Sequence, residues 1–237
     1  MDWRDAAAGS DFRPTAMGGA GGAERERRET EYAKLPLIPS YFEIERNGFV
    51  DGVNFASSIC RCLVETNRGL EVYRRGGRKF AIFTLVPLGC FPSARAFVLQ
   101  QNKTDDCFEE LNELLKLHNL ILPKMLKQLQ KELKGFMYTL FDLYKVVDQR
   151  VNNPSKYGFE VSKMACCGTG PFRGINSCGG RREVKDYQLC QNPKDYVFFD
   201  SSHPSESPYK QSAELLWHGD PDVTGPHSLK SFFELSG

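Results

Sequence analysis

Residues 79–86 read Lys79-Phe80-Ala81-Ile82-Phe83-Thr84-Leu85-Val86, and this stretch decides the fold class. It is a nearly continuous apolar run, which is typical of a parallel strand buried on both faces of its sheet. Pro87 and Gly89 follow it and predict that the strand ends there. We therefore expect one strand of a buried parallel sheet over these residues.

The residues after this strand have the spacing of a long helix, at roughly 106–134. Its predicted apolar face consists of Phe108, Leu111, Leu115, Leu122, Leu126, Leu129 and Leu133. We interpret this face as core and not as a groove for lipid. Pro123 should kink or divide the helix, because proline removes a backbone donor and clashes with the preceding turn. Gly135 suits the C-terminal cap.

Strands and helices continue to alternate beyond this point. A strand is predicted at 136–141, and Asp142 is a natural N-cap for a short helix that reaches about Val151. A final helix is expected at 208–217, closed by Gly219. The other predictions are a short strand at 53–56 and a cysteine- and glycine-rich loop at 152–195. This order predicts an α/β protein with a parallel sheet.

Composition narrows the class of protein. The 237 residues include 31 basic and 30 acidic side chains, so net charge gives no reason to expect nucleic acid or an anionic membrane as a partner. No apolar run reaches the roughly 18 residues of a membrane-spanning helix, so stable membrane insertion is not expected. Residues 1–30 are Gly/Ala-rich and then charged, and we interpret them as a disordered or non-native leader without the apolar region of a signal peptide.

Eight cysteines point to an oxidising compartment. Four of them lie at Cys166, Cys167, Cys178 and Cys190, and because no C-x-x-C pair occurs, disulfides are expected and a zinc site is not. Asn102 begins a glycosylation sequon, which is a weak signal alone. The cysteines favour secretion and the N-terminus does not, so both the extracellular and the intracellular location stay open.

A candidate acid–base pair lies near the C-terminus, where the sequence reads Tyr196-Val197-Phe198-Phe199-Asp200-Ser201-Ser202-His203-Pro204. A short apolar strand ends in a carboxylate, and an imidazole follows three residues later. An aspartate can orient a histidine, and the histidine can then accept a proton from a serine hydroxyl. Asp200 and His203 are therefore the candidate catalytic residues. By contrast, His118 is expected to be structural, and His218 and His227 to be solvated.

Several blocks of sequence together resemble the plant GDSL-type esterases/lipases of the SGNH hydrolase superfamily, and they cover most of residues 31–237. They are Gly52-Val53-Asn54-Phe55-Ala56-Ser57, Gly77-Arg78-Lys79-Phe80 through Pro87-Leu88-Gly89-Cys90, Leu117-His118-Asn119, Tyr157-Gly158-Phe159, Ala165-Cys166-Cys167-Gly168-Thr169-Gly170 and Asp200-Ser201-Ser202-His203-Pro204. The resemblance implies a three-layer α/β/α fold with a flavodoxin-like parallel sheet, secretion, no cofactor or metal, and hydrolysis of lipid or small acyl esters. It also implies His203 as the general base and Asp200 as its partner.

The sequence departs from the family pattern at the other catalytic blocks. The nucleophilic serine of a Gly-Asp-Ser block is not present, and Gly9-Ser10-Asp11 has the order reversed. The Gly-x-Asn-Asp block is also absent, and Ser58-Ile59-Cys60-Arg61 stands where the family has a glycine block. Ser57 and Ser58 have no Gly-x-Ser-x-Gly around them and are not expected to replace the nucleophile.

Three interpretations follow from these departures. The first is a GDSL esterase/lipase-like protein whose catalysis is impaired. The second is a non-catalytic pseudoenzyme that binds a ligand or partner, and the third is a truncated splice product or faulty gene model with no selected function. Because two middle strands of the family sheet are missing, we also expect an incomplete domain over 31–237, which folds poorly alone or keeps only its C-terminal half compact. The natural ester and the oligomeric state are left open.

Overall fold

The computed structural model describes residues 72–102, 104–179 and 183–234. The predictions for the leader at 1–30, the strand at 53–56 and the serines and cysteines at 57–62 lie outside these residues. Within them the chain is a mixed α/β protein with small sheets, which confirms the predicted class. None of the helices in the described ranges combines the length and the hydrophobicity of a membrane span.

The main sheet is built on β1 (Lys79–Phe83) and β2 (Met137–Phe141), which pair in parallel. The short β7 (Thr224–Gly225) adds to β2 in the antiparallel sense. The parallel pairing was predicted, but β1 ends at Phe83 and not at Val86. Its side chains are half-buried or exposed, because among the described residues it has a partner strand on one edge only. Helices cover both faces of the sheet, but, contrary to the expectation, the side chains of β1 are not fully buried.

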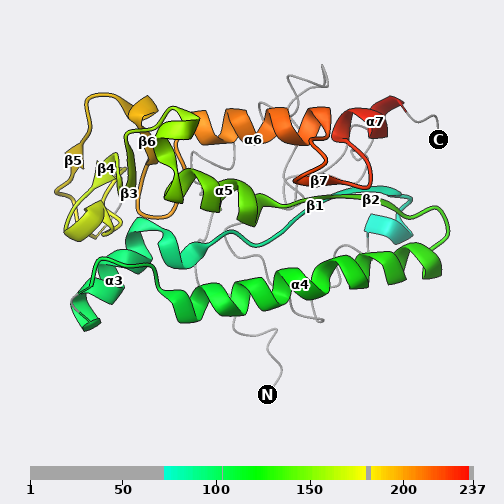
Figure 1. Cartoon of the computed structure of the whole chain (residues 1–237), viewed down its shortest axis with the longest axis horizontal. Coiled ribbons are helices and arrows are strands. Elements are labelled where there is room, and N and C mark those ends of the chain that lie inside the picture. The colour runs from blue at the N-terminus through cyan, green and yellow to red at the C-terminus, as the bar shows by residue number, and fades with distance from the viewer. Residues whose placement is uncertain (1–71, 103, 180–182, 235–237) are drawn as a thin grey trace, which may run out of the picture.

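Side chains alternate across this sheet and create two apolar layers. Phe80, Ile82 and Tyr138 pack on α4 (Glu109–Glu132), together with Leu126. Phe83 and Phe141 point to the other face and pack with side chains of α5 (Leu143–Asn152) and α6 (Glu206–His218). Figure 1 shows the result, with α4 on one side of the sheet and α5 and α6 on the other.

Helix α4 confirms the long predicted helix, with differences at its centre and its end. Pro123 lies inside it without dividing it, and the C-cap is Leu133 instead of Gly135, which follows with a positive φ of 76°. Leu115 and Leu126 are buried as predicted, and Leu122, Leu129 and Leu133 pack against the same core. Another helix, α3 (Pro92–Asn102), was missed, because its hydrophobic residues show little periodicity.

Two further sheets, each of two strands, are formed largely by the stretch that was predicted to be loop. β3 (Val161–Ala165) pairs in parallel with β6 (Tyr196–Phe198), and β4 (Cys167–Gly168) pairs with β5 (Gln188–Leu189). The loop prediction was therefore wrong for β3, β4 and β5. The remaining elements are the 3-10 helices Leu88–Cys90, Pro154–Tyr157, Pro171–Arg173 and Pro193–Asp195, and helix α7 (Leu229–Glu234).

The caps of the C-terminal helices agree with the sequence. The Asp142 side chain accepts a hydrogen bond from the Lys145 amide at the start of α5, as a side-chain N-cap does. Gly219 ends α6 with a φ of 79°, a left-handed conformation that glycine adopts without steric cost. The structure corrects one detail, since α7 follows and α6 is not the final helix.

Candidate active site

The candidate site is the loop that follows β6. Phe198 and Val197 are fully buried, so the strand is anchored in the core, and the chain turns immediately after it. The amide of Phe199 donates to the carbonyl oxygen of His203 at 2.8 Å, which closes the turn. Further along, the Ser205 hydroxyl donates to the Tyr196 carbonyl, and the chain then enters α6. The loop is thus fixed at both ends by regular structure.

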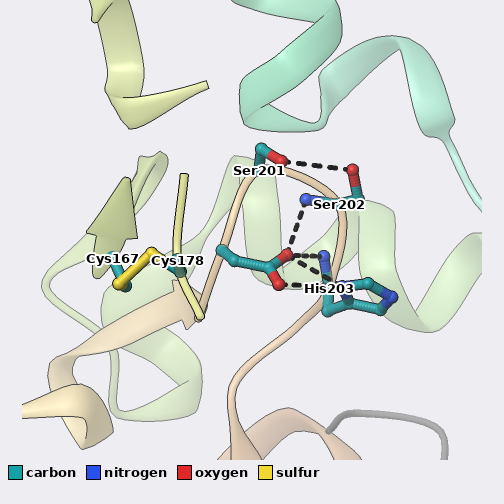
Figure 2. Close-up of polar contacts among 6 residues, drawn as sticks. Cys167, Cys178, Ser201, Ser202 and His203 are labelled. Carbon is teal, nitrogen blue, oxygen red and sulfur yellow. Dashed lines mark hydrogen bonds and ion pairs between the residues drawn. A yellow bond between two sulfur atoms is a disulfide. The ribbon is translucent and has the colours of Figure 1, made fainter. Parts of the chain in front are cut away.

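Within this turn the Asp200 carboxylate is held by several donors. Its Oδ1 accepts from the amides of Ser202 at 2.9 Å and His203 at 2.8 Å. The Nδ1 atom of His203 lies 2.8 Å from Oδ1 and 3.0 Å from Oδ2 of the same carboxylate, as the dashed lines in Figure 2 show. The Asp200 side chain is 16% exposed and that of His203 is 35% exposed. The structure brings together the two residues that the sequence singled out.

The environment of Asp200 favours its charged form. Burial acts to raise its pKa, but the hydrogen bonds from His203 and from the Ser202 amide, together with the charge of the imidazole, outweigh burial and hold the pKa below its ordinary value. An ionised Asp200 at Nδ1 fixes the ring orientation and favours the tautomer with the proton on Nδ1. Nε2 is then the nitrogen that would accept a proton from a hydroxyl.

Disulfides support the strand that carries this loop. Cys166–Cys190 and Cys167–Cys178 confirm that the four clustered cysteines are oxidised, and the second bridge is drawn beside the loop in Figure 2. The amide of Cys166 donates to the carbonyl of Phe198 at 2.9 Å, and the amide of Cys167 donates to Phe199 at 2.7 Å. The cross-linked segment is therefore hydrogen-bonded to the residues that lead directly into Asp200.

A third disulfide, Cys90–Cys107, was not predicted. Only the clustering of the other four cysteines gave a signal in the sequence.

Among the described residues, Cys90, Cys107 and Glu109 are the only group whose side-chain atoms lie as close together as metal ligands do. Both sulfur atoms are consumed by the disulfide, and metal binding by cysteine requires a thiolate, so the donor set does not fit a metal ion.

In the Leu117-His118-Asn119 block, Asn119 is the residue whose side chain holds the backbone of another segment in place. The side-chain Oδ1 of Asn119 accepts from the Leu85 amide at 2.8 Å, and its Nδ2 donates to the Leu85 carbonyl at 2.8 Å. This side chain thus pairs with the backbone just beyond β1 as a neighbouring strand would. His118 is exposed, and its Nδ1 lies 3.3 Å from Asn119 Oδ1.

The fold and the site define a class before any comparison is made. A carboxylate held against an imidazole, on a loop after a parallel strand of an α/β protein, is an arrangement that can carry out acid–base chemistry. The family model of GDSL-like lipase/acylhydrolase matches residues 52–216. The chain belongs to this family, and membership implies the SGNH-hydrolase fold.

Individual relatives support this assignment. The chain is 49% identical over 166 residues to GDSL esterase/lipase 4 of Arabidopsis thaliana, covering 70% of this chain and 44% of that protein. It is 34% identical over 274 residues to a GDSL lipase of Tanacetum cinerariifolium, covering 86% and 73%. It is also 35% identical over 204 residues to the inactive GDSL esterase/lipase-like protein 25 of Arabidopsis thaliana, covering 86% and 44%. The chain spans less than half the length of several relatives.

The disulfides and the plant relatives are consistent with the secretory pathway.

Proposed function

We propose that this chain is an esterase homologue that keeps the acid–base half of a serine hydrolase site and hydrolyses carboxylic esters little or not at all. His203 is the general base of the ancestral reaction, and Asp200 orients it. The observation that carries the proposal is the intact Asp200–His203 geometry in a sequence without a Gly-Asp-Ser block.

The magnitude of the expected impairment follows from the chemistry. An imidazole without a hydroxyl to activate cannot form an acyl-enzyme. Removal of the nucleophile from a serine triad lowers turnover by about a millionfold, and each lost oxyanion-hole donor costs a further factor of roughly a hundred to a thousand. The Gly-x-Asn-Asp block and the glycine block are departures in this sequence as well. The residual rate of ester hydrolysis should therefore be close to the rate that a free imidazole side chain produces.

A pseudoenzyme is the second candidate, because the site keeps a positioned carboxylate and imidazole in a sequence without the nucleophile block. One relative at 35% identity is named an inactive GDSL esterase/lipase-like protein, so loss of activity has a precedent in a similar sequence. In this version, the site binds a lipid or small acyl ester without turnover. Within the proposal, the described sheet is part of the family's three-layer α/β/α architecture in residues 31–237, and the protein acts outside the cell without a cofactor.

Hydrolysis of p-nitrophenyl butyrate tests both candidates. Wild type, His203→Ala and the matched control His118→Ala, an exposed histidine in α4, are compared at equal concentration. Equal and very low rates in all three, together with no labelling by a fluorophosphonate probe, are expected. A rate that falls only in His203→Ala would reveal a working nucleophile and overturn the proposed impairment.

Binding separates the two candidates when turnover is absent. Saturable binding of a non-hydrolysable ester analogue, measured by calorimetry and weakened in His203→Ala, supports the pseudoenzyme. If the analogue does not bind saturably, the result supports the first candidate, an impaired esterase homologue that has not kept ligand binding.

A further inference from the structure

Helix α4 carries large apolar side chains on the surface that faces away from the sheet. The exposed fractions are 67% for Leu114, 55% for Leu117, 66% for Leu120, 45% for Ile121 and 55% for Met125. Leu114, Leu117, Ile121 and Met125 follow a spacing of three or four residues, so they form one stripe along the helix. These are not the residues that pack on the sheet, and the helix therefore has a second apolar face.

A row of lysines runs beside this stripe. Lys116, Lys124, Lys127 and Lys131 continue the same helical spacing, with Leu120 between the first two. Residues 114–131 contain these four lysines and no aspartate or glutamate. The four glutamates of α4, at Glu109, Glu110, Glu113 and Glu132, lie outside this span and balance the lysines over the whole helix, so the positive charge is local to residues 114–131.

Most of these lysines are not neutralised by the protein. Lys116 pairs with Glu113 at 2.9 Å, at a position where both side chains are largely exposed. Lys124, Lys127 and Lys131 form no ion pair with any residue in the described ranges. Their charge is thus available to an external anionic group.

The composition of this surface favours lipid over protein as its occupant. Protein interfaces are enriched in aromatic residues and arginine and depleted in lysine, whereas helices that lie at a membrane surface combine aliphatic side chains with lysines. A second copy of the chain would bring one lysine row against another. Leu115 and Leu126, buried on the opposite face, fix the helix to the sheet, so its roughly 36 Å length is presented as one rigid line.

We propose that α4 is a docking surface for an anionic lipid bilayer, with Leu114, Leu117, Ile121 and Met125 in the headgroup region and the lysines on anionic headgroups. This is adsorption to the surface and not insertion across the bilayer. The proposal is independent of the Asp200–His203 site and holds whether or not the protein hydrolyses esters.

Co-sedimentation with vesicles tests it on the full chain. The vesicles are pure phosphatidylcholine or phosphatidylcholine with about a third phosphatidylserine. Wild type is expected to bind the anionic vesicles at least about tenfold more tightly, and less so in high salt. Lys124→Gln/Lys127→Gln should weaken binding by about twenty-five-fold, at about fivefold for each lysine. Leu117→Gln/Ile121→Gln should weaken it by about tenfold or more.

Leu189→Gln and Lys194→Gln are the matched controls, since both residues are exposed and lie outside α4. They should bind like wild type, and all variants should show the thermal melt of wild type. Three outcomes overturn the proposal: no binding to anionic vesicles, equal binding to both vesicle types, or equal loss in the α4 variants and the controls. A dimer in light scattering that Leu117→Gln/Ile121→Gln dissociates would also overturn it, because a second copy would then occupy the face.

Discussion

Oδ1 of Asp200 lies 2.8 Å from both the backbone nitrogen and the ring Nδ1 of His203. One carboxylate oxygen therefore fixes the backbone of the turn and the direction of the imidazole together. This coupling means that the pair has a structural role in addition to its chemical one. It also gives a physical reason why the two side chains keep this geometry in a sequence without a Gly-Asp-Ser block, since the turn itself depends on the contact.

The first prediction concerns the pH dependence of stability. Because the pKa of Asp200 in the folded protein is below its ordinary value of 3.8, the stabilisation is complete above that value and is lost as the pH falls through the lowered pKa. Asp200→Asn should reduce the free energy of unfolding by about 1–3 kcal/mol at pH 6. The deficit relative to wild type should shrink at pH 3. Urea unfolding of both proteins at the two pH values measures it.

Asp186→Asn, a substitution at an exposed loop position, is the control for this experiment and should match wild type at both pH values. If the Asp200→Asn deficit were the same at pH 3 and pH 6, the carboxylate would not be stabilised in its charged form, and the structural role assigned to it would be wrong.

The second prediction concerns Asn119. Its amide is the side-chain partner of the Leu85 backbone, with one donor and one acceptor used. Asn119→Ala should lower the free energy of unfolding by about 1–3 kcal/mol, because the Leu85 groups lose both bonds. Asn119→Asp keeps the acceptor but places a carboxylate beside the Leu85 carbonyl oxygen, so it should be at least as destabilising. His118→Ala, next to it and exposed, should have little effect in the same thermal melts.

The elements that could be predicted from the sequence are those with strong local signals. The apolar runs of β1 and β2, the long periodicity of α4 and the Asp142 and Gly219 caps each depend on residues close in the chain. β3 was missed because Val161–Ala165 contains a lysine and a serine and obtains its structure from pairing with β6, which is distant in sequence. Tertiary contacts thus outweighed local propensity there.

The candidate site also combines residues that a local sequence pattern predicts with contacts that only the fold reveals. Asp200 and His203 are three residues apart, and a short motif was sufficient to place them together. The support from Cys166 and Cys167 depends on strand pairing that no local pattern reveals. The lysine row of α4 was visible in the sequence, but the net charge masked it, and the exposed leucines beside it could not be distinguished from core leucines without the fold.

The third prediction concerns the Cys167–Cys178 disulfide. It closes a loop of 11 residues' separation, and Cys167→Ser/Cys178→Ser should lower the free energy of unfolding by about 2–4 kcal/mol through the greater entropy of the unfolded chain. Because the Cys167 amide donates to Phe199, the loss should extend to the Asp200 loop. Amide hydrogen exchange of Ser202 and His203 should accelerate in the double variant. Unchanged exchange there would show that the disulfide does not support the site.

The last prediction concerns Arg150, which is only 3% exposed. Its Nε donates to Gln211 Oε1 at 2.8 Å, one NH2 group donates to the Val146 carbonyl, and the guanidinium lies over the Tyr157 ring at 4.6 Å. No described carboxylate forms an ion pair with it, and burial lowers its pKa. The cation is thus stabilised by neutral groups that join α5 to α6.

Removing Gln211, which accepts the hydrogen bond from Arg150 Nε, should therefore lower the free energy of unfolding more than removing Arg150 itself. Gln211→Leu leaves the buried Nε without its partner and should destabilise the protein by about 1.5–3 kcal/mol. Arg150→Met keeps an apolar stem and removes the desolvated charge, so its cost should be smaller, as for other buried charges replaced by apolar residues. In the Arg150→Met background, Gln211→Leu should lose the part of its effect that comes from the Arg150 Nε bond and keep the part that comes from the bond of Gln211 Nε2 to the Tyr157 carbonyl. Urea unfolding of the four proteins in this double-mutant cycle measures the coupling, and additive effects would show that the two side chains do not stabilise each other.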